Sequence, residues 1–404
     1  MHKGENEPVG RASLFSGISR NVFVLGLTSF LTDFSTELYY PLLPIFLTKV
    51  IGTGVMFVGV IEGVAESTAS LLKLVSGWLS DRLNRRKALV IGGYTLSGLT
   101  RPIIAISTMG WHVLAARFID RIGKGFRTAP RDVLIADSTD PDHRGKAFGF
   151  HRSMDHAGAV VGPLVAFILM KFIGEQYRTI FWLSSIPAIL AIIVLAAFVK
   201  DIRRKDDGKK LPALTLKPFN QNFKIFLPIV ILFTLGNSSD AFLILRAGNL
   251  GVATLLIPIL WVVLHIVKML SSMPGGIWSD KAGRRLVIIT GWGVYSLIYL
   301  GFAFAKAQWH IWALFAVYGI YFGLTEGAEK AFVADLVPSD LRGTAYGIYN
   351  FAIGIAAFPS SSIMGFIWET FSPETAFIFG AILSMASVLL LLAFVKGAGN
   401  EKTP

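Results

Sequence analysis

The sequence predicts an all-α membrane protein with about twelve transmembrane helices in two pseudo-symmetric bundles of six. Of its 404 residues, 53% are hydrophobic and only 16% are charged, which is too little polar surface for a soluble domain of this length. Apolar runs of about 20 residues or more recur along the chain, and each can cross a hydrocarbon core of about 30 Å. The second half also repeats motifs of the first half, which indicates two related helical units.

The internal repeat is clearest in two pairs of segments. Residues 136–149 return as residues 334–347, where Ala, Asp, Asp, Arg, Gly, Ala and Gly recur with unchanged spacing. Residues 77–86 return as residues 276–285, where a Gly, an Asp and two adjacent Arg keep their positions. All four segments connect long apolar runs, so equivalent connectors carry equivalent motifs. The repeat therefore predicts that the chain consists of two similar six-helix units.

Twelve spans can be placed in order, with a margin of about two to four residues at each end. They cover residues 21–47, 54–80, 88–108, 111–136, 145–171, 178–199, 223–246, 252–278, 286–306, 309–335, 344–368 and 374–395. The predicted domains are a cytoplasmic segment over 1–20, a six-helix bundle over 21–199, a basic cytoplasmic linker over 200–222, a second six-helix bundle over 223–396 and a cytoplasmic tail over 397–404.

The placement of charge orients the chain in the membrane. The net charge of +12 comes from basic residues that gather in alternate connectors, above all in 200–222, whereas connectors 109–110 and 306–308 are nearly bare. Positive connectors stay in the cytoplasm, so both termini and the linker are expected there. We expect a multi-pass protein of a plasma membrane, and from its compactness a bacterial inner membrane. The same distribution of charge argues against nucleic-acid binding.

Several kinds of chemistry are excluded or disfavoured. Cysteine is absent, which excludes disulfides, thiolate metal sites and a cysteine nucleophile. The first apolar run lacks the cleavage pattern of a removed signal peptide, so it is expected to anchor the chain. The sequence has no nucleophile elbow, no phosphate-cradling glycine loop after a strand and no His-Glu-x-x-His motif. We therefore expect neither an enzyme nor a bound cofactor, and the protein is expected to act as a monomer.

Over nearly its whole length the chain resembles the major facilitator superfamily of secondary transporters. The resemblance rests on twelve spans, the six-plus-six repeat and residues 77–86, which are similar to that family's signature between spans two and three. Asn84 replaces its usual glycine, and the second copy keeps the glycine at Gly283. The resemblance implies two bundles that rock about a central cavity, with charged residues acting as gates. The gating residues expected in the connectors and adjacent helix ends are Asp81, Arg85, Arg131, Asp280, Arg284, Asp137, Arg144, Asp335 and Arg342.

The fourth predicted span carries a stripe of cations on one helical face. Its members are Arg117, Arg121, Lys124, Thr128 and Arg131, at steps of four, three, four and three. A charge at the bilayer centre costs at least about 2.5–3.5 kcal/mol, so several of them need partners or a water-filled cavity. Arg121 stands where the family's motif in this span has a glycine. We expect Arg121 and Lys124 to face an anionic or zwitterionic substrate, and a structural ion-pair network is the alternative.

Carboxylates in the predicted spans are candidates for proton coupling. A carboxylate that lies between desolvation and nearby cations can take up a proton in one state and release it in another. The candidates are Asp33, Glu37, Asp155 and Glu326, and the alternative for each is a permanent ion pair. In the superfamily, spans one, four, seven and ten line the cavity. The resemblance therefore implies that Asp240, Glu326 and Glu329 bind substrate together with Arg121 and Lys124.

The favoured function is proton-coupled transport of a small organic solute by alternating access, with export favoured over uptake. Half of a motif reported in family antiporters, Gly158-x-x-x-Gly162-Pro163, supports export. Multidrug efflux is an alternative because Phe is abundant, at 31 residues. Divalent metal transport is another, through His151, Asp155 and His156 or through Asp33, Glu37 and His265. A membrane receptor or sensor, and an enzyme acting on lipids, are further alternatives.

Overall fold

The structure is a computed structural model that describes residues 19–82, 86–139, 144–201, 216–338 and 341–395. Within those ranges, the side chains at 74, 77–82 and 144–146 lie outside the description. Three predicted gating residues, Asp81, Arg85 and Arg144, therefore fall on side chains or residues outside it.

The described part of the chain is built of helices, as the sequence predicts. The first half comprises α1 (Arg20–Tyr39), the 3-10 turn η1 (Tyr40–Leu42), α2 (Leu43–Ile45), the π-helix η2 (Phe46–Ile51), α3 (Val55–Arg82), α4 (Arg86–Ile106), α5 (Gly110–Asp137), α6 (Arg144–Ile173) and α7 (Tyr177–Phe198). The second half comprises α8 (Gln221–Gly236), α9 (Ala241–Asn249), the 3-10 turn η4 (Thr254–Leu256), α10 (Ile257–Ala282), α11 (Arg284–Phe304), α12 (Gln308–Asp335), α13 (Arg342–Thr370) and α14 (Pro373–Phe394).

Helix starts follow ordinary capping chemistry. The side chains of Ser19, Asn220 and Ser372 each accept a hydrogen bond from the backbone N–H three residues on, at 3.3, 2.9 and 3.1 Å. These bonds satisfy N–H groups that the first helical turn leaves without partners. Gly283, in the tight turn between α10 and α11, has φ +92°, a conformation that side chains disfavour. The glycine of the second repeat motif is thus explained by its backbone.

Ten stretches in the described residues are long and apolar enough to cross a membrane. The predicted spans outside those ten are those of α1 and α5, which carry Asp33 and Glu37 and the stripe of cations. The twelve-span helical fold is confirmed, and the charged residues of α1 and α5 make these two spans less apolar than the other ten.

One predicted element is wrong in detail. Residues 223–246 were expected to form one helix, but α8 ends at Gly236 and α9 begins at Ala241. The intervening Asn-Ser-Ser-Asp segment carries short polar side chains that compete with helical hydrogen bonds. Its serines bond outward instead, Ser238 to the Tyr299 hydroxyl at 3.1 Å and the Ser239 backbone N–H to the Ser361 hydroxyl at 3.2 Å.

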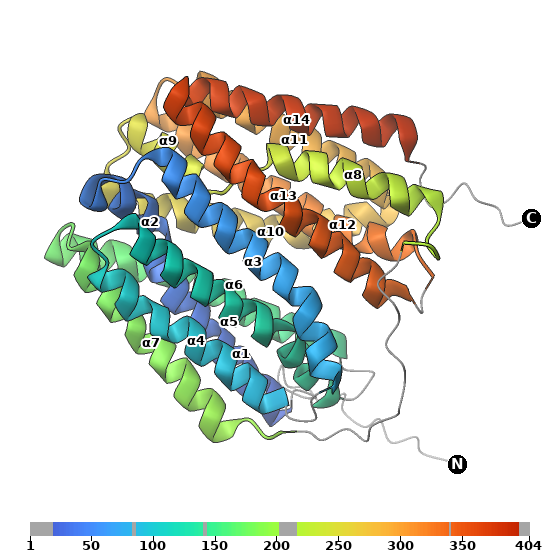
Figure 1. Cartoon of the computed structure of the whole chain (residues 1–404), viewed down its shortest axis with the longest axis horizontal. Helices are drawn as coiled ribbons and strands as arrows, with labels where there is room; N and C mark the ends of the chain where they lie inside the picture. The colour runs from blue at the N-terminus through green and yellow to red at the C-terminus, as the bar shows by residue number, and fades with distance from the viewer. Residues whose placement is uncertain (1–18, 83–85, 140–143, 202–215, 339–340, 396–404) are drawn as a thin grey trace, which may run out of the picture.

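The helices form two groups that follow the two halves of the chain (Figure 1). In the first group α1 packs on α6 and α7, and α5 packs on α3 and α4. In the second, α12 packs on α10 and α11, and α14 packs on α8 and α11. The groups meet mainly where α3 lies along α13 and where α6 lies along α10. Toward the ends of the chain their ribbons diverge, as Figure 1 shows.

The contact between α3 and α13 is close because glycines lie in it. A Cβ added at Gly63 would lie 2.9 Å from the carbonyl oxygen of Phe358, and one at Gly365 would lie 2.8 Å from the Cα of Met56. These contacts use the first half of α3 and the second half of α13. Small residues allow such backbone approach in lipid, where packing drives helix association.

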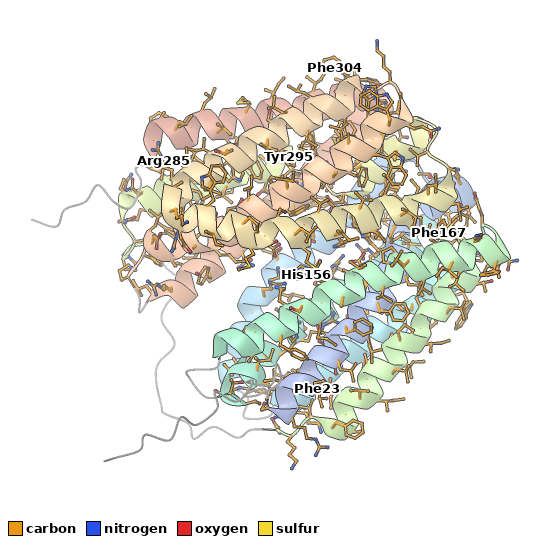
Figure 2. All side chains as sticks on the ribbon, turned by 180° about the vertical axis from the view of Figure 1, so that it is seen from behind. Phe23, His156, Phe167, Arg285, Tyr295 and Phe304 are labelled. Atoms are coloured by element: carbon orange, nitrogen blue, oxygen red, sulfur yellow. The ribbon has the colours of Figure 1, made fainter. Side chains whose placement is uncertain are left out.

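Both halves run from the diverging side of the molecule to the joined side and back. In Figure 2, Arg285, near the start of α11, lies on the side where the groups diverge, while Phe304 and Phe167, near the ends of α11 and α6, lie on the opposite side. The repeated basic motifs at the starts of α4 and α11 therefore lie on the diverging side. The structure is joined at one end and opens toward the other.

Candidate functional site

A cavity of ≈ 390 Å³ lies between the two groups of helices. From the first group it is lined by residues of η1, α3 and α5, and from the second by residues of α8, the α8–α9 break, α10, α11, α12 and α13. Its charged lining residues are Glu62, Glu66, Arg121, Asp240, Lys268, Glu326 and Glu329. Four of the five predicted substrate-binding residues, Arg121, Asp240, Glu326 and Glu329, are therefore brought together at one cavity.

Behind the wall of the first group lies a cluster of buried ion pairs. Arg117 of α5 donates two hydrogen bonds to the Glu62 carboxylate of α3, at 3.1 and 2.7 Å. Arg101 of α4 donates to Asp120 of α5 at 2.8 Å, and both side chains are almost fully buried. These contacts tie α3, α4 and α5 together, although the buried Nη1 of Arg117 has no hydrogen-bond partner among the described residues. Arg117 thus belongs to a structural cluster of ion pairs.

Arg121 differs from these two arginines. It lines the cavity, and its Nε lies 3.8 Å from Asp120 Oδ2, too far for a hydrogen bond. Asp120 already accepts a short hydrogen bond from Arg101, so the carboxylate nearest to Arg121 is paired with another guanidinium. Three guanidiniums thus face the two carboxylates of Glu62 and Asp120. Among these five groups the guanidiniums outnumber the carboxylates by one, while Glu66, a further carboxylate, lies with Arg121 on the cavity wall.

A second, smaller pocket of ≈ 80 Å³ lies beside the cavity. It is lined by Asp33, Thr36, Glu37, Tyr40, Asp120, Arg121, Lys124 and Arg127. Lys124, the fifth predicted substrate-binding residue, is exposed here and has no ion pair among the described residues. Arg127 donates to the Ser97 hydroxyl at 2.7 Å. Arg121 lines both pockets and so connects the predicted proton-coupling acids of α1 to the cavity.

The two acids of α1 have different partners. Glu37 accepts a hydrogen bond from the Trp261 indole of α10 at 2.7 Å, which joins the two groups of helices. Asp33 has no ion pair in the described part of the chain and lies on the lining of the smaller pocket. Glu37 therefore connects the smaller pocket to the second group of helices, while Asp33 faces Lys124 and Arg127 across a small polar space.

The acids of the second group are held by different donors. Asp240 precedes α9 and accepts a bond from the Tyr318 hydroxyl at 2.6 Å. Glu329 accepts from the Trp292 indole at 2.7 Å and the Tyr349 hydroxyl at 2.6 Å. Neither acid has an ion pair among the residues that the structure describes.

Glu326 has cationic partners on two other helices. Lys268 of α10 lies 3.2 Å from its carboxylate, and Arg152 of α6 lies 3.9 Å away, across the interface between the groups. Lys330, four residues after Glu326 on the same helix, makes no such ion pair in the described residues. Asp155 lies 3.6 Å from His151 and 3.8 Å from Arg152. No group of three or more His, Asp or Glu in the described residues could hold a metal ion.

The repeated motifs form matched ion pairs at the diverging side. Arg86 donates to Asp137 at 2.6 Å, and Arg284 donates to Asp335 at 2.8 Å. Arg284 also lies 3.6 Å from Asp280. Two other predicted gating residues make only local contacts: Arg131 pairs with its neighbour Asp132 at 2.8 Å, and Arg342 donates to the Ala334 carbonyl at 3.4 Å.

Sequence reasoning missed several residues of the site. Arg101 lies in an apolar span without a charged neighbour at helical spacing, yet a lone arginine there was itself a signal. Trp261, Tyr318 and Tyr349 carried no signal, because only the packing of distant helices turns an aromatic residue into a partner of a carboxylate. Ser67 is another missed residue. Its hydroxyl bonds backbone groups of α13, and the Gly354 carbonyl that it contacts is 287 residues away in the sequence.

Two helical groups, charges buried within their spans and a polar cavity between them define a membrane transporter by fold and site. The Major Facilitator Superfamily model matches residues 25–361 and 241–404, and the chain belongs to this family. It is 36% identical over 381 residues to an uncharacterized MFS-type transporter of Methanocaldococcus jannaschii, with 93% of this chain and 95% of that protein covered.

Two further likenesses are more distant in sequence. The multi-drug resistance efflux pump PmrA of Streptococcus pneumoniae is 24% identical over 320 residues, covering 76% of this chain and 78% of the pump. The crystal structure of the nucleoside transporter NupG superposes with a TM-score of 0.78 at 13% identity, covering 92% of this chain and 98% of that one. The last likeness confirms the fold.

Proposed function

We propose that this protein is a proton-coupled secondary active transporter of a small organic anionic or zwitterionic solute. The observation that carries the proposal is the incompletely paired Arg121 on the cavity wall. Arg117 and Arg101 have close carboxylate partners, whereas Arg121 lines the cavity with only a shared carboxylate at 3.8 Å. An incompletely paired guanidinium next to an open space can bind the carboxylate or phosphate of a solute with bidentate geometry. Lys124 adds a second cation beside it.

The test is binding to the purified protein, because a ligand that binds only the native state raises its melting temperature. A screen of organic anions and amino acids identifies a ligand. Arg121→Ala is then expected to lower its affinity about tenfold or more, as for a lost charge-assisted hydrogen bond. Arg121→Lys is expected to retain part of the affinity, since lysine keeps the charge but loses the fork.

Arg20→Ala is the matched control, because Arg20 lies exposed at the start of α1 and lines neither pocket. It should leave affinity unchanged. Equal affinity in the wild type and in Arg121→Ala would reduce Arg121 to a structural residue and remove the basis of the proposal.

Proton coupling is proposed for Asp33 and Glu37, followed by Asp155 and Glu326. Asp33 and Glu37 line the same small pocket as Arg121 and Lys124, so a proton on either acid changes the charge that a bound anion meets. Asp33→Asn and Glu37→Gln should preserve exchange of substrate but abolish uphill transport driven by a pH gradient, because an amide carries no proton. Uphill transport that survives in both variants would move the coupling role to Asp155 or Glu326.

The two halves, 21–199 and 223–396, are proposed to rock as units between states open to either side, with 200–222 in the cytoplasm. Export is favoured, and the efflux pump among the relatives agrees with it. Cysteines placed at Arg204 and Arg284 should react with an impermeant reagent only from the cytoplasmic side, and one at Gly110 only from outside. The background is clean because the native chain has no cysteine.

Multidrug efflux remains a second candidate, favoured by the aromatic residues Tyr40, Phe233, Trp292, Tyr321 and Phe322 on the cavity wall. The same screen separates the two candidates. Structurally unrelated uncharged drugs that bind independently of Arg121 would favour efflux of drugs over transport of a charged solute.

A further inference from the structure

Acidic residues outnumber basic ones on the wall of the central cavity. Among the described residues that line it, five are carboxylates and two are basic, Arg121 and Lys268. Lys268 is already committed to Glu326 at 3.2 Å. Only Arg121 is therefore open to a solute anion, and a purely anionic solute would enter a site whose other charges repel it. The lining requires a positive charge from the solute as well.

The carboxylates differ in how far they are neutralised. Glu62 is bonded twice to Arg117, and Glu326 has Lys268 and Arg152. Both oxygens of Glu329 accept hydrogen bonds from neutral donors of its own group. Asp240 has one neutral donor, the Tyr318 hydroxyl on Oδ1, and its Oδ2 accepts no hydrogen bond from the residues that the structure describes. Among the cavity carboxylates of the second group that the structure describes, Asp240 thus has an oxygen atom available to bind a ligand.

The backbone around Asp240 reinforces its negative charge. Residues 237–240 line the cavity and separate α8 from α9. The carboxyl end of α8, at Gly236, lies directly before them and carries the partial negative charge of a helix end. The Tyr40 ring of the opposite group also lines the cavity, but the Arg117 guanidinium already lies 5.2 Å from its centroid, so the helix end and the carboxylate provide the attraction. Asp240 therefore lies in surroundings that attract a cation.

We propose that the transported solute is amphoteric, with its anionic group facing Arg121 and an organic ammonium group bound to Asp240 Oδ2. This inference rests on the proposed function, and it selects the zwitterion over the plain anion. An ammonium group has three N–H donors and can be held by one carboxylate together with hydroxyl and carbonyl oxygens. Asn237 and Ser239 supply such oxygens on the same wall. Arg121 and Asp240 belong to different helical groups, so an amphoteric solute would bridge the two.

The experiment compares ligands that share a carbon skeleton. One set is phenylalanine, 2-phenylethylamine and 3-phenylpropionate, and another is 4-aminobutyrate, butylamine and butyrate. Binding is followed by titrated thermal shift and by calorimetry of the full-length protein in sodium-free buffer. The amphoteric member of at least one set is expected to bind about tenfold or more tightly than its acid and its amine. Asp240→Asn should remove that advantage and leave affinity for the acid unchanged.

Two variants control for folding and for charge. Tyr318→Phe keeps the carboxylate while removing its donor, so the preference for the amphoteric ligand should persist. Asp201→Asn removes an exposed acid that lines neither the cavity nor the smaller pocket, and it should change nothing. The melting temperature of each unliganded variant reports whether it folds.

Three outcomes of the ligand comparison would overturn the inference. They are an acid that binds as tightly as its amphoteric counterpart, an amphoteric preference that survives Asp240→Asn, and a panel in which no amphoteric member binds. If only the acid of a set binds, and Arg121→Ala lowers its affinity, the proposed function stands and only the inference is refuted. Binding that ignores Arg121→Ala would refute the proposed function itself. Sodium ion that alone stabilises the wild type but not Asp240→Asn would assign the site to an alkali ion and also overturn the inference.

Discussion

Replacing Ser67 by alanine tests how the two groups of helices are held together. The Ser67 hydroxyl of α3 accepts a hydrogen bond from the Phe358 backbone N–H at 3.0 Å and donates one to the Gly354 carbonyl. In an uninterrupted helix these two backbone groups of α13 would bond each other. The Ser67 hydroxyl is therefore inserted into the backbone hydrogen bonding of α13. This happens directly before Pro359, which follows Phe358 and has no N–H of its own.

The magnitude follows from counting bonds. Ser67→Ala removes two hydrogen bonds across the interface, each worth about 0.5–1.5 kcal/mol net. Gly354 and Phe358 can then re-form one bond within α13, which leaves a net loss of about 0.5–1.5 kcal/mol. This loss falls only on the state in which α3 and α13 are joined. The population of that state relative to the alternative should fall by about 2- to 13-fold.

The assay uses spin labels on cysteines placed at Asp201 and Lys281, which are exposed on different halves of the chain. If the groups rock, Ser67→Ala should raise the fraction of molecules in a second, shorter distance between the labels. Ser153→Ala is the matched control, because its hydroxyl bonds only the Gly149 carbonyl of its own helix. A distance distribution that is the same in Ser67→Ala, Ser153→Ala and the parent would refute the reasoning.

Three further predictions concern single contacts. Glu62→Gln leaves a buried guanidinium without its carboxylate and should lower the free energy of unfolding by about 3–5 kcal/mol, measured by denaturation in detergent; a loss below about 1 kcal/mol would show that the cluster relaxes. Arg86→Ala should destabilise more than Arg284→Ala, because the side chains of the first pair are 9% and 18% exposed and those of the second 29% and 31%; the opposite order of melting temperatures would contradict this. Trp261→Phe should weaken closure at the joined end but spare proton-driven uptake or export. Glu37→Gln should keep closure, since its amide oxygen still accepts the indole N–H. Label distances and transport assays separate the two effects, and identical behaviour of the two variants would contradict this prediction.

The architecture was predictable because its signals are local. Apolar runs, alternating basic connectors and the repeat predicted the helical fold, which the structure confirms. The stripe on α5 was also visible at helical spacing. Its pairing was not, because partners on other helices are set by packing. Glu62 and Glu66 share a face by spacing, yet Glu62 is buried against Arg117 while Glu66 is exposed. Glu326 likewise pairs with a lysine on another helix.

The break before Asp240 was missed for a related reason. Four short polar residues within an apolar run can be tolerated in a helix or can interrupt it. The hydroxyls of Tyr299 and Ser361, which hold the interrupted backbone, come from α11 and α13. Mean hydropathy averages over this segment, so residues 221–249 still form a single apolar stretch that is long enough to cross a membrane. Only the tertiary contacts show the interruption.

The strength of the interface sets what a solute must do to drive the cycle. Polar contacts across it at the joined end include Lys49 to Thr254 at 3.2 Å, the Met56 N–H to Glu369 at 2.8 Å and Trp261 to Glu37 at 2.7 Å. Each is worth about 1 kcal/mol, or up to about 3 when a charged group takes part. A ligand that moves an equilibrium from 1:99 to 99:1 needs about 5.5 kcal/mol of differential binding. If the solute bridges the two groups through opposite charges, as proposed above, its differential binding acts on the same equilibrium as these contacts. Binding at the cavity and release of the joined end would then be coupled, and the solute would not have to break each contact separately.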